Sequence, residues 1–439
     1  MHHPPRLRLL APICLSLLAV APAFGGEAPS IDVEEARAAI AQAERLCRLD
    51  DGHLWGVSLC GPLLLADPAT HRVVASAADA HGELRAEHGV YVGRLPDAVQ
   101  VANTALDWNG VQWVALSWPL PREPEARARL LMHESWHRIQ GALGLPQASP
   151  TPAHLDSLDG RIRMRLEWRA LAAALSPRGK ALRQQAIADA LTIRAWRRQL
   201  GGTAAADERA LELNEGLAEY TGYRLAGADA YARVRADLRA AEQGASFVRS
   251  FAYHSGPALG LLLDEADAHW RSRLAASTDL GTLLGEAESI VMPADLEAAA
   301  QKVLARYSGG DLRAQEQARD RAQRALRAQW QAKLVDGPVL LLPFSDMHIG
   351  FDPRNLVALP PHGTVYPTLR ISDRWGTLSV VDGALIDDNW SGVQVPAPAH
   401  GGASAHPQGD GWQLDLAHGW TLVPSAKSGD YTLRMEKDP

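Results

Sequence analysis

The sequence predicts an α+β protein with a strand-rich N-terminal part, a mainly helical central domain and a small C-terminal β domain. Two changes of pattern along the chain lead to this expectation. Short apolar runs broken by Gly, Pro and Asp fill the first part, whereas residues 125–334 are rich in Ala, Leu, Arg and Glu. Beyond Gly337 short strands separated by turn residues return.

Residues 1–25 are typical of a secretory signal peptide. Arg6 and Arg8 precede the apolar run 9–21, and small residues follow it. The alternative is a membrane anchor, which the shortness of the run and its interruption by Pro12 disfavour. We therefore expect the chain to be exported, to a periplasm or to the medium, with no transmembrane helix left after signal removal.

The N-terminal β-rich region, residues 26–110, is expected to open with a helix over 31–49. Short strands should follow, at 55–59, 63–65, 73–75 and 90–92. The region contains Cys47 and Cys60, an even number in a chain bound for an oxidising compartment, which favours a disulfide. Two unpaired thiols packed as small apolar residues are the alternative.

The central domain, residues 111–335, should start with the strand 111–118 and continue with at least six helices. Its charged segment 311–333 is expected to be a solvated helix. Gly and Pro residues predict helix breaks near 141–152, 176–179, 201–206, 227, 255–257 and 308–310.

The C-terminal region, residues 336–439, is expected to form a small β domain. A Gly- and Pro-rich piece, 395–411, should be a long surface loop. The expected strands are 339–342, 366–371, 376–381, 412–416 and 431–435.

The overall charge excludes one class of partner. The formal net charge is -7 and the pI is about 6.1, with no long Lys/Arg run. Binding to nucleic acid needs a basic surface that neutralises phosphates. We therefore expect no nucleic-acid partner.

Residues 133–137 read His-Glu-Ser-Trp-His within a segment whose composition suits a helix. Two histidines four residues apart lie on one helical face, so their imidazoles can bind one metal ion. Glu134 lies beside that face and could take a proton from a water that zinc has made acidic. The alternative is a pair of surface histidines on an amphipathic helix, with Glu134 solvated.

A catalytic zinc ion needs a third protein ligand from another element. Glu215 is the best candidate, because Glu212, Glu215 and Glu219 share one face of a predicted helix and repel one another unless a cation lies among them. A solvated acidic stripe is the alternative. Glu167 is the reserve ligand, although it could pair with Arg163 or Arg169 on its own helix.

The motif at 133–137 together with Asn214-Glu215-Gly216-Leu217-Ala218-Glu219 resembles the gluzincin metallopeptidases, the group of thermolysin and the zinc aminopeptidases. The resemblance implies a zincin-like catalytic domain with one zinc ion held by His133, His137 and Glu215. It also implies that Asn214 and Glu219 orient the two histidines. Glu215 follows His137 by 78 positions, which exceeds the usual spacing, so 155–200 is expected to be an insertion that folds aside.

The segment 251–265 is similar to the Tyr-containing stretch that follows the zinc helix in the aminopeptidase branches of that group. This implies that the Tyr253 hydroxyl stabilises an oxyanion, with His254 as an alternative donor. A tyrosine packed at a helix start is the other interpretation. The Gly-x-Met-Glu-Asn string that holds the substrate's amino terminus in the aminopeptidases does not occur.

From these residues we expect a zinc metallopeptidase that acts on a peptide or protein substrate, with Glu134 as general base and Tyr253 supporting the oxyanion. The strand 111–118 should pair with extended substrate. Two other functions fit the same residues. One is an inactive, zinc-containing binding or scaffold protein, and the other is a zinc hydrolase of a non-peptide substrate.

Overall fold

The computed structural model of the chain describes residues 31–435 apart from 97–98, 100, 178, 228, 352–354 and 399–405. The expected signal peptide lies outside the described residues. Within the described ranges, no helix is both long and apolar enough to cross a membrane. The α+β class is confirmed, and the chain divides into two compact units, one up to Arg313 and one from Ala314 onward.

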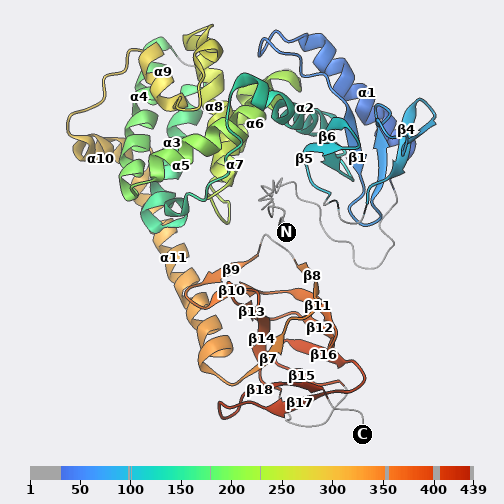
Figure 1. Cartoon of the computed structure of the whole chain (residues 1–439). Helices are drawn as coiled ribbons and strands as arrows, with labels where there is room; N and C mark the ends of the chain where they lie inside the picture. Colours follow the sequence, from blue (N-terminus) through green and yellow to red (C-terminus); the bar gives the residue numbers. More distant parts are fainter. Residues whose placement is uncertain are drawn as a thin grey trace, which may run out of the picture. The chain divides into compact units, whose positions relative to one another are not determined.

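The first unit begins with helix α1 (Val33–Asp50) and a six-stranded sheet (Figure 1). The parallel pair of β1 and β6 lies inside this sheet, and all other neighbours are antiparallel. In sheet order the strands are β3 (Arg85–Glu87), β4 (Val90–Arg94), β2 (Arg72–Ala75), β1 (Leu63–Ala66), β6 (Val111–Ser117) and β5 (Thr104–Trp108).

Alternating side chains of this sheet face two apolar clusters, as the two-residue period of a strand requires. Leu63 and Leu65 pack with residues of α1 and of helix α2 (Pro124–Gln140), whereas Leu64 and Ala66 pack with Trp113 on the opposite face. The sheet therefore supports one side of α2, the helix that carries the His-Glu-Ser-Trp-His motif.

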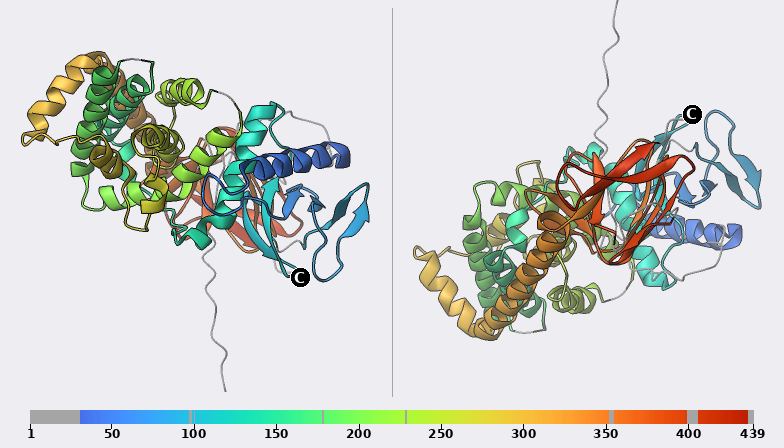
Figure 2. Two further views of the ribbon diagram at one scale, coloured as in Figure 1. Left: turned by 90° about the horizontal axis from the view of Figure 1, so that it is seen from above. Right: turned by 90° about the horizontal axis from the view of Figure 1, so that it is seen from below.

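Helices make up the rest of the first unit, beside the sheet (Figure 2). Their core joins residues from α2 through α9. The α-helices after α2 are α3 (Leu158–Ala174), α4 (Lys180–Arg197), α5 (Ala204–Leu211), α6 (Leu217–Leu225), α7 (Ala230–Ala241), α8 (Ser250–Ala266), α9 (Leu280–Ala287) and α10 (Leu296–Arg306), and α11 (Gly309–Gln331) begins in this unit and continues into the second. The short turns of the first unit are η1 (Gly141–Leu143), η2 (Ala153–Asp156), η3 (Arg198–Leu200), the π-helical η4 (Glu212–Gly216) and η5 (Trp270–Arg273), and the π-helical η6 (Ala332–Asp336) follows α11 in the second unit.

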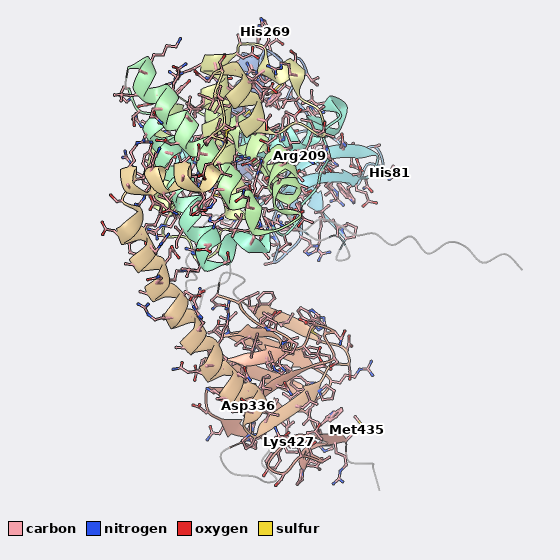
Figure 3. The ribbon with its side chains drawn as sticks, turned by 90° about the vertical axis from the view of Figure 1, so that its left-hand side faces the viewer. His81, Arg209, His269, Asp336, Lys427 and Met435 are labelled. Carbon is pink, nitrogen blue, oxygen red and sulfur yellow. A yellow bond between two sulfur atoms is a disulfide. The ribbon has the colours of Figure 1, made fainter. Side chains whose placement is uncertain are left out.

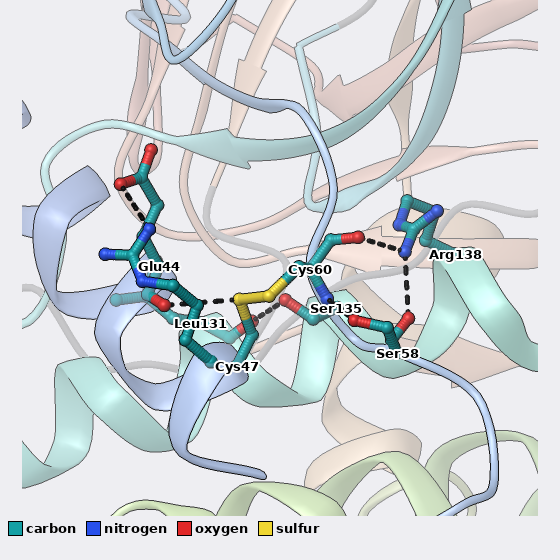
Figure 4. Close-up of a disulfide and its surroundings, with 8 residues drawn as sticks. Glu44, Cys47, Ser58, Cys60, Leu131, Ser135 and Arg138 are labelled. Atoms are coloured by element: carbon teal, nitrogen blue, oxygen red, sulfur yellow. Dashed lines mark hydrogen bonds and ion pairs between the residues drawn. A yellow bond between two sulfur atoms is a disulfide. The ribbon is translucent and has the colours of Figure 1, made fainter. Parts of the chain in front are cut away.

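The disulfide between Cys47 and Cys60 is confirmed. It closes a loop that lies against α2 (Figure 4). Arg138 of α2 donates from Nη2 to the Cys60 carbonyl at 2.6 Å. Within the loop, the Trp55 ring contacts Trp136 of α2, with centroids 4.3 Å apart. The expected strand at 55–59 is wrong: the segment forms turns that insert Trp55 into the helical core.

Two expectations for the helical part are also wrong. Helix α8 runs through Pro257 without a break, and its buried face from Phe251 to Leu263 holds it in place. The segment 155–200 does not fold aside, because Trp168 of α3 is fully buried in the common core. At Pro257, tertiary packing outweighs the local cost of a proline inside a helix. At 155–200, tertiary packing holds the segment in the core in spite of the unusual spacing between the ligands.

The region boundaries also differ from those expected. No boundary lies between residues 110 and 111, because β5 and β6 pair across it in one sheet. The second unit begins at Ala314, inside α11, rather than at 336. Because the division lies inside a continuous charged helix, composition alone does not reveal it.

The second unit contains two sheets that share an apolar core. Lys427 contacts η6, since its Nζ donates to the Val335 carbonyl at 3.3 Å. Figure 3 labels Lys427 and Asp336, the last residue of η6. The expected strand 366–371 is two strands, one in each sheet. The seven-stranded sheet contains, in order, β17 (Trp420–Pro424), β18 (Tyr431–Met435), β7 (Val339–Pro343), β14 (Gly392–Pro396), β13 (Ala384–Ile386), β10 (Gly363–Tyr366) and β9 (Val357–Leu359). The five-stranded sheet contains β15 (Gln408–Gly409), β16 (Trp412–Leu416), β12 (Gly376–Val380), β11 (Leu369–Asp373) and β8 (His348–Phe351).

Candidate metal centre

Helix α2 brings His133 and His137 together, as their spacing predicts. The two Nε2 atoms are 3.2 Å apart. Both histidines and Glu134 are buried, so the alternative of solvated surface histidines is wrong. The helix is well defined at its start, where the Glu123 carboxylate caps it by accepting from the Ala126 N–H.

Glu215 completes a three-residue group from a separate element, the η4 turn. Its Oε2 lies 3.5 Å from Nε2 of His133 and 3.7 Å from Nε2 of His137. These are the residues of the described chain whose side chains are grouped closely enough to hold a metal ion. Glu215 is therefore not part of a solvated stripe.

The donor set fits zinc. Zinc prefers His nitrogen and carboxylate oxygen at about 2.0 Å in a tetrahedron, which places donor atoms about 3.3 Å apart. The three measured separations, 3.2, 3.5 and 3.7 Å, are close to that spacing. A zinc ion held by these three side chains alone would keep its fourth position open, as in catalytic zinc sites.

The other ring nitrogens are held by neighbouring polar groups. Nδ1 of His133 lies 2.8 Å from Oε2 of Glu219, and Nδ1 of His137 lies 3.0 Å from Oε1 of Gln140. If each Nδ1 carries the hydrogen and donates it, each Nε2 presents a lone pair to the metal. Glu219 thus contacts its histidine directly, as expected.

Asn214 is linked to His137 through Gln140. Its Oδ1 accepts from Nε2 of Gln140 at 3.0 Å, and its Nδ2 donates to Oε1 of Glu215 at 3.2 Å. Gln140 was not among the residues singled out from the sequence. The signal was available, because Gln140 is three residues after His137 on the same helix and so lies on the same face.

The electrostatics of the group favour a cation between the carboxylates. Burial lowers the pKa of His133, but hydrogen bonding to Glu215 and Glu219 outweighs it and raises that pKa to about 10. Burial raises the pKa of Glu215, but contacts with the two histidines dominate and hold it far below its ordinary value. A divalent metal ion can supply the same positive charge.

Glu134 lies next to the group and is 1% exposed. Its Oε2 is buried without a hydrogen-bond partner among the described residues. Burial raises the pKa of this carboxyl group. A buried carboxylate oxygen without a donor is costly in free energy, and a polar ligand would relieve that cost.

Tyr253 reaches the group from α8. Its hydroxyl donates to Oε2 of Glu215 at 2.6 Å, and its ring stacks on His133 with centroids 5.6 Å apart. The neighbouring His254 contacts the Trp168 ring instead, and burial lowers its pKa to about 4. Tyr253 is thus the donor in contact with the metal group, whereas His254 packs on Trp168.

Two other glutamates considered as ligands or near neighbours lie elsewhere. Glu167 is paired with Arg194 and Arg197 of α4, not with arginines of its own helix. Glu212 is also paired with Arg194, so it leaves the face that it was expected to share with Glu215. The π-helical turn at η4 changes the spacing on which that expectation rested.

Comparison with known proteins gives no relative: no family model, no curated protein and no solved structure matches this chain.

Proposed function

We propose that this chain is an exported zinc metallopeptidase in which His133, His137 and Glu215 hold one zinc ion. The observation that carries the proposal is the buried, unpartnered Oε2 of Glu134 beside a group with three metal-ligand side chains. The geometry supports the metal centre, and the buried carboxylate supports a general base. The resemblance to gluzincins supports the peptide substrate.

In this proposal Glu134 moves the proton. When bound, zinc supplies Lewis-acid chemistry and makes a water acidic enough to react near neutral pH. Oε2 of Glu134 accepts the proton from that water and returns it to the nitrogen of the leaving amine. Burial favours this role, because it raises the carboxyl pKa toward the operating pH.

Tyr253 is proposed to donate to the substrate's carbonyl oxygen as negative charge develops there. Its hydroxyl already lies beside the metal group, 2.6 Å from Oε2 of Glu215. Loss of one such donor typically costs about 10²–10³ in rate.

The strand expected to pair with substrate cannot do so. β6 is hydrogen-bonded to β1 on one side and to β5 on the other. The edge strand beside it is β5 (Thr104–Trp108), and an extended peptide could be added there. We therefore assign substrate pairing to β5.

The test replaces Glu134 with Gln, which removes the base and keeps the shape. We expect zinc content to stay at the wild-type level while cleavage of a peptide library falls by about 10²–10⁴. Glu125→Gln on the same helix is the matched control and should cleave normally. Wild-type protein that binds zinc but leaves the library intact would contradict the peptidase assignment. Ester and amide panels then separate a non-peptide hydrolase from an inactive binding protein.

A further inference from the structure

Arg249 places a positive charge beside the metal group, and the mechanism proposed above does not use it. The residue immediately precedes α8, the helix that carries Tyr253, and its side chain does not cap that helix. Its Nη2 lies 3.9 Å from Oε1 of Glu215, which is within ion-pair distance but too long for a hydrogen bond. Because Arg249 and Tyr253 are four residues apart, they approach the group from the same side of α8.

The backbone at Arg249 is fixed by two phenylalanines that flank it, Phe247 and Phe251, both fully buried. The Phe247 ring packs on Trp168 of α3 with centroids 4.7 Å apart, and its N–H donates to Oδ1 of Asp156 at 2.7 Å. The Phe251 N–H in turn donates to the Phe247 carbonyl at 3.1 Å. The guanidinium therefore projects from a rigid segment, as a preorganised binding group should.

Glu215 does not need Arg249 as a hydrogen-bond donor. Its Oε1 accepts from Nδ2 of Asn214 at 3.2 Å, and its Oε2 accepts from the Tyr253 hydroxyl at 2.6 Å. Nη2 of Arg249 faces Glu215 and is buried without a hydrogen bond. Nε and Nη1 have no hydrogen bond to another described residue and are not buried, and the side chain is 33% exposed. A ligand can therefore reach the guanidinium at Nε and Nη1.

The charge of Arg249 is unfavourable for the metal unless a ligand balances it. Two cations near each other repel, and the repulsion is strong where water is excluded. Among the described residues, Glu215 is the one carboxylate within 4.0 Å of the guanidinium, and the first turn of α8 has no acidic side chain. When zinc takes up the charge of Glu215, Arg249 is left without a counterion. A carboxylate on the substrate would supply one.

We propose that Arg249 is a specificity-determining residue that binds a carboxylate of the substrate beside the bond that is cut. This inference rests on the proposed peptidase function and names its substrate class, peptides with a negative charge near the cleavage site. Arginine suits the task because its planar guanidinium can donate to both oxygens of a carboxylate. The carboxylate is either the C-terminus of the peptide or an Asp or Glu side chain.

The first test measures binding, so it does not depend on turnover. Succinic acid monohydroxamate carries a zinc-binding group at one end and a carboxylate at the other, and the matched probe has a carboxamide in place of the carboxylate. By titration calorimetry, the zinc-loaded wild type should bind the carboxylate probe about tenfold more tightly. Arg249→Gln should remove this preference, and Arg249→Lys should keep part of it. Arg239→Gln, at an exposed position on α7, is the matched control and should keep all of it.

The zinc affinity of Arg249→Gln separates this role from a structural one. If Arg249 only held Glu215 in place, its loss would weaken zinc binding. Because a neighbouring cation repels zinc, we expect Arg249→Gln to bind zinc at least as tightly as the wild type does. Competition with a chromophoric chelator measures the difference, and a clear loss of zinc affinity would overturn the proposal.

The last test identifies the source of the carboxylate. Zinc-loaded Glu134→Gln is titrated with one short peptide in three forms: with a free C-terminus, with an amidated C-terminus, and amidated with a glutamate added. Tightest binding of the first form assigns the C-terminus, and tightest binding of the third assigns the side chain. Equal binding of all three forms, or a probe preference that survives in Arg249→Gln, overturns the proposal and leaves the peptidase assignment intact. An Arg249-dependent preference without any cleavage by the wild type supports the carboxylate site and contradicts the peptidase assignment alone.

Discussion

At the scale of single residues, the metal centre depends on side chains that do not bind the metal. Glu219 holds Nδ1 of His133 at 2.8 Å and is itself held by Nε of Arg129 at 3.3 Å. Arg129 is in turn paired with Asp237 of α7 at 3.2 Å. The orientation of one imidazole is thus connected to a third helix.

This chain of contacts predicts the effect of Glu219→Gln. The amide is a weaker acceptor for Nδ1–H and removes the charge that makes His133 a better donor to the metal, so zinc affinity should fall about 10–100-fold. Competition with a chromophoric chelator measures the change. Glu87→Gln, at an exposed position on β3, is the control and should bind zinc as wild type does. Equal affinities for the two variants would contradict this role of Glu219.

At the scale of elements, the centre is assembled where two helices cross closely. A Cβ on Gly256 of α8 would lie 2.3 Å from the Cα of Gly216, the residue after Glu215. The close approach brings Tyr253 of α8 to Glu215. Glycine at 256 is therefore a geometric requirement of the site, whereas a Cβ at Gly216 would make a tight contact, 3.0 Å from the Cα of Gly256.

Gly256→Ala should consequently disturb both stability and metal binding. The added methyl meets backbone atoms that cannot move independently, so we expect a loss of about 1–3 kcal/mol in the free energy of unfolding. Zinc affinity should fall as well, because the added methyl pushes α8 away from η4. Urea denaturation with and without zinc measures both effects. Gly310→Ala serves as control, and a variant as stable as that control would rule out the tight crossing.

The sequence predicts these elements unevenly, for physical reasons. The spacing of His133 and His137 is local, so an ordinary helix suffices to place them on one face. The prediction of Glu215 as the third ligand required a second element of the fold and the family resemblance. The π-helical turn that carries it, and the continuation of α8 through Pro257, follow from tertiary packing, which periodicity does not report.

At the scale of the whole molecule, each compact unit has its own apolar core. The metal group belongs to the first unit only. The alternation of strands and helices was enough to predict the α+β class, but not the boundary inside α11 or the shared sheet of β5 and β6. Strand pairing joins residues far apart in sequence, which composition does not encode.

This division predicts how metal removal affects unfolding. Zinc stabilises only the unit that binds it, by an amount that grows with zinc concentration over the dissociation constant. Calorimetry of the full chain should therefore show two transitions, and a chelator should lower the temperature of one of them. A chelator that shifts both transitions equally would contradict separate cores.

The most direct test of the central claim is the metal content of the purified protein, prepared without chelators and measured by elemental analysis. We expect one zinc ion per chain in the wild type and almost none after His133→Ala. The Glu134→Gln variant should keep its zinc, because Glu134 is not a ligand. A folded wild type that contains no zinc and takes up none on addition would contradict the account.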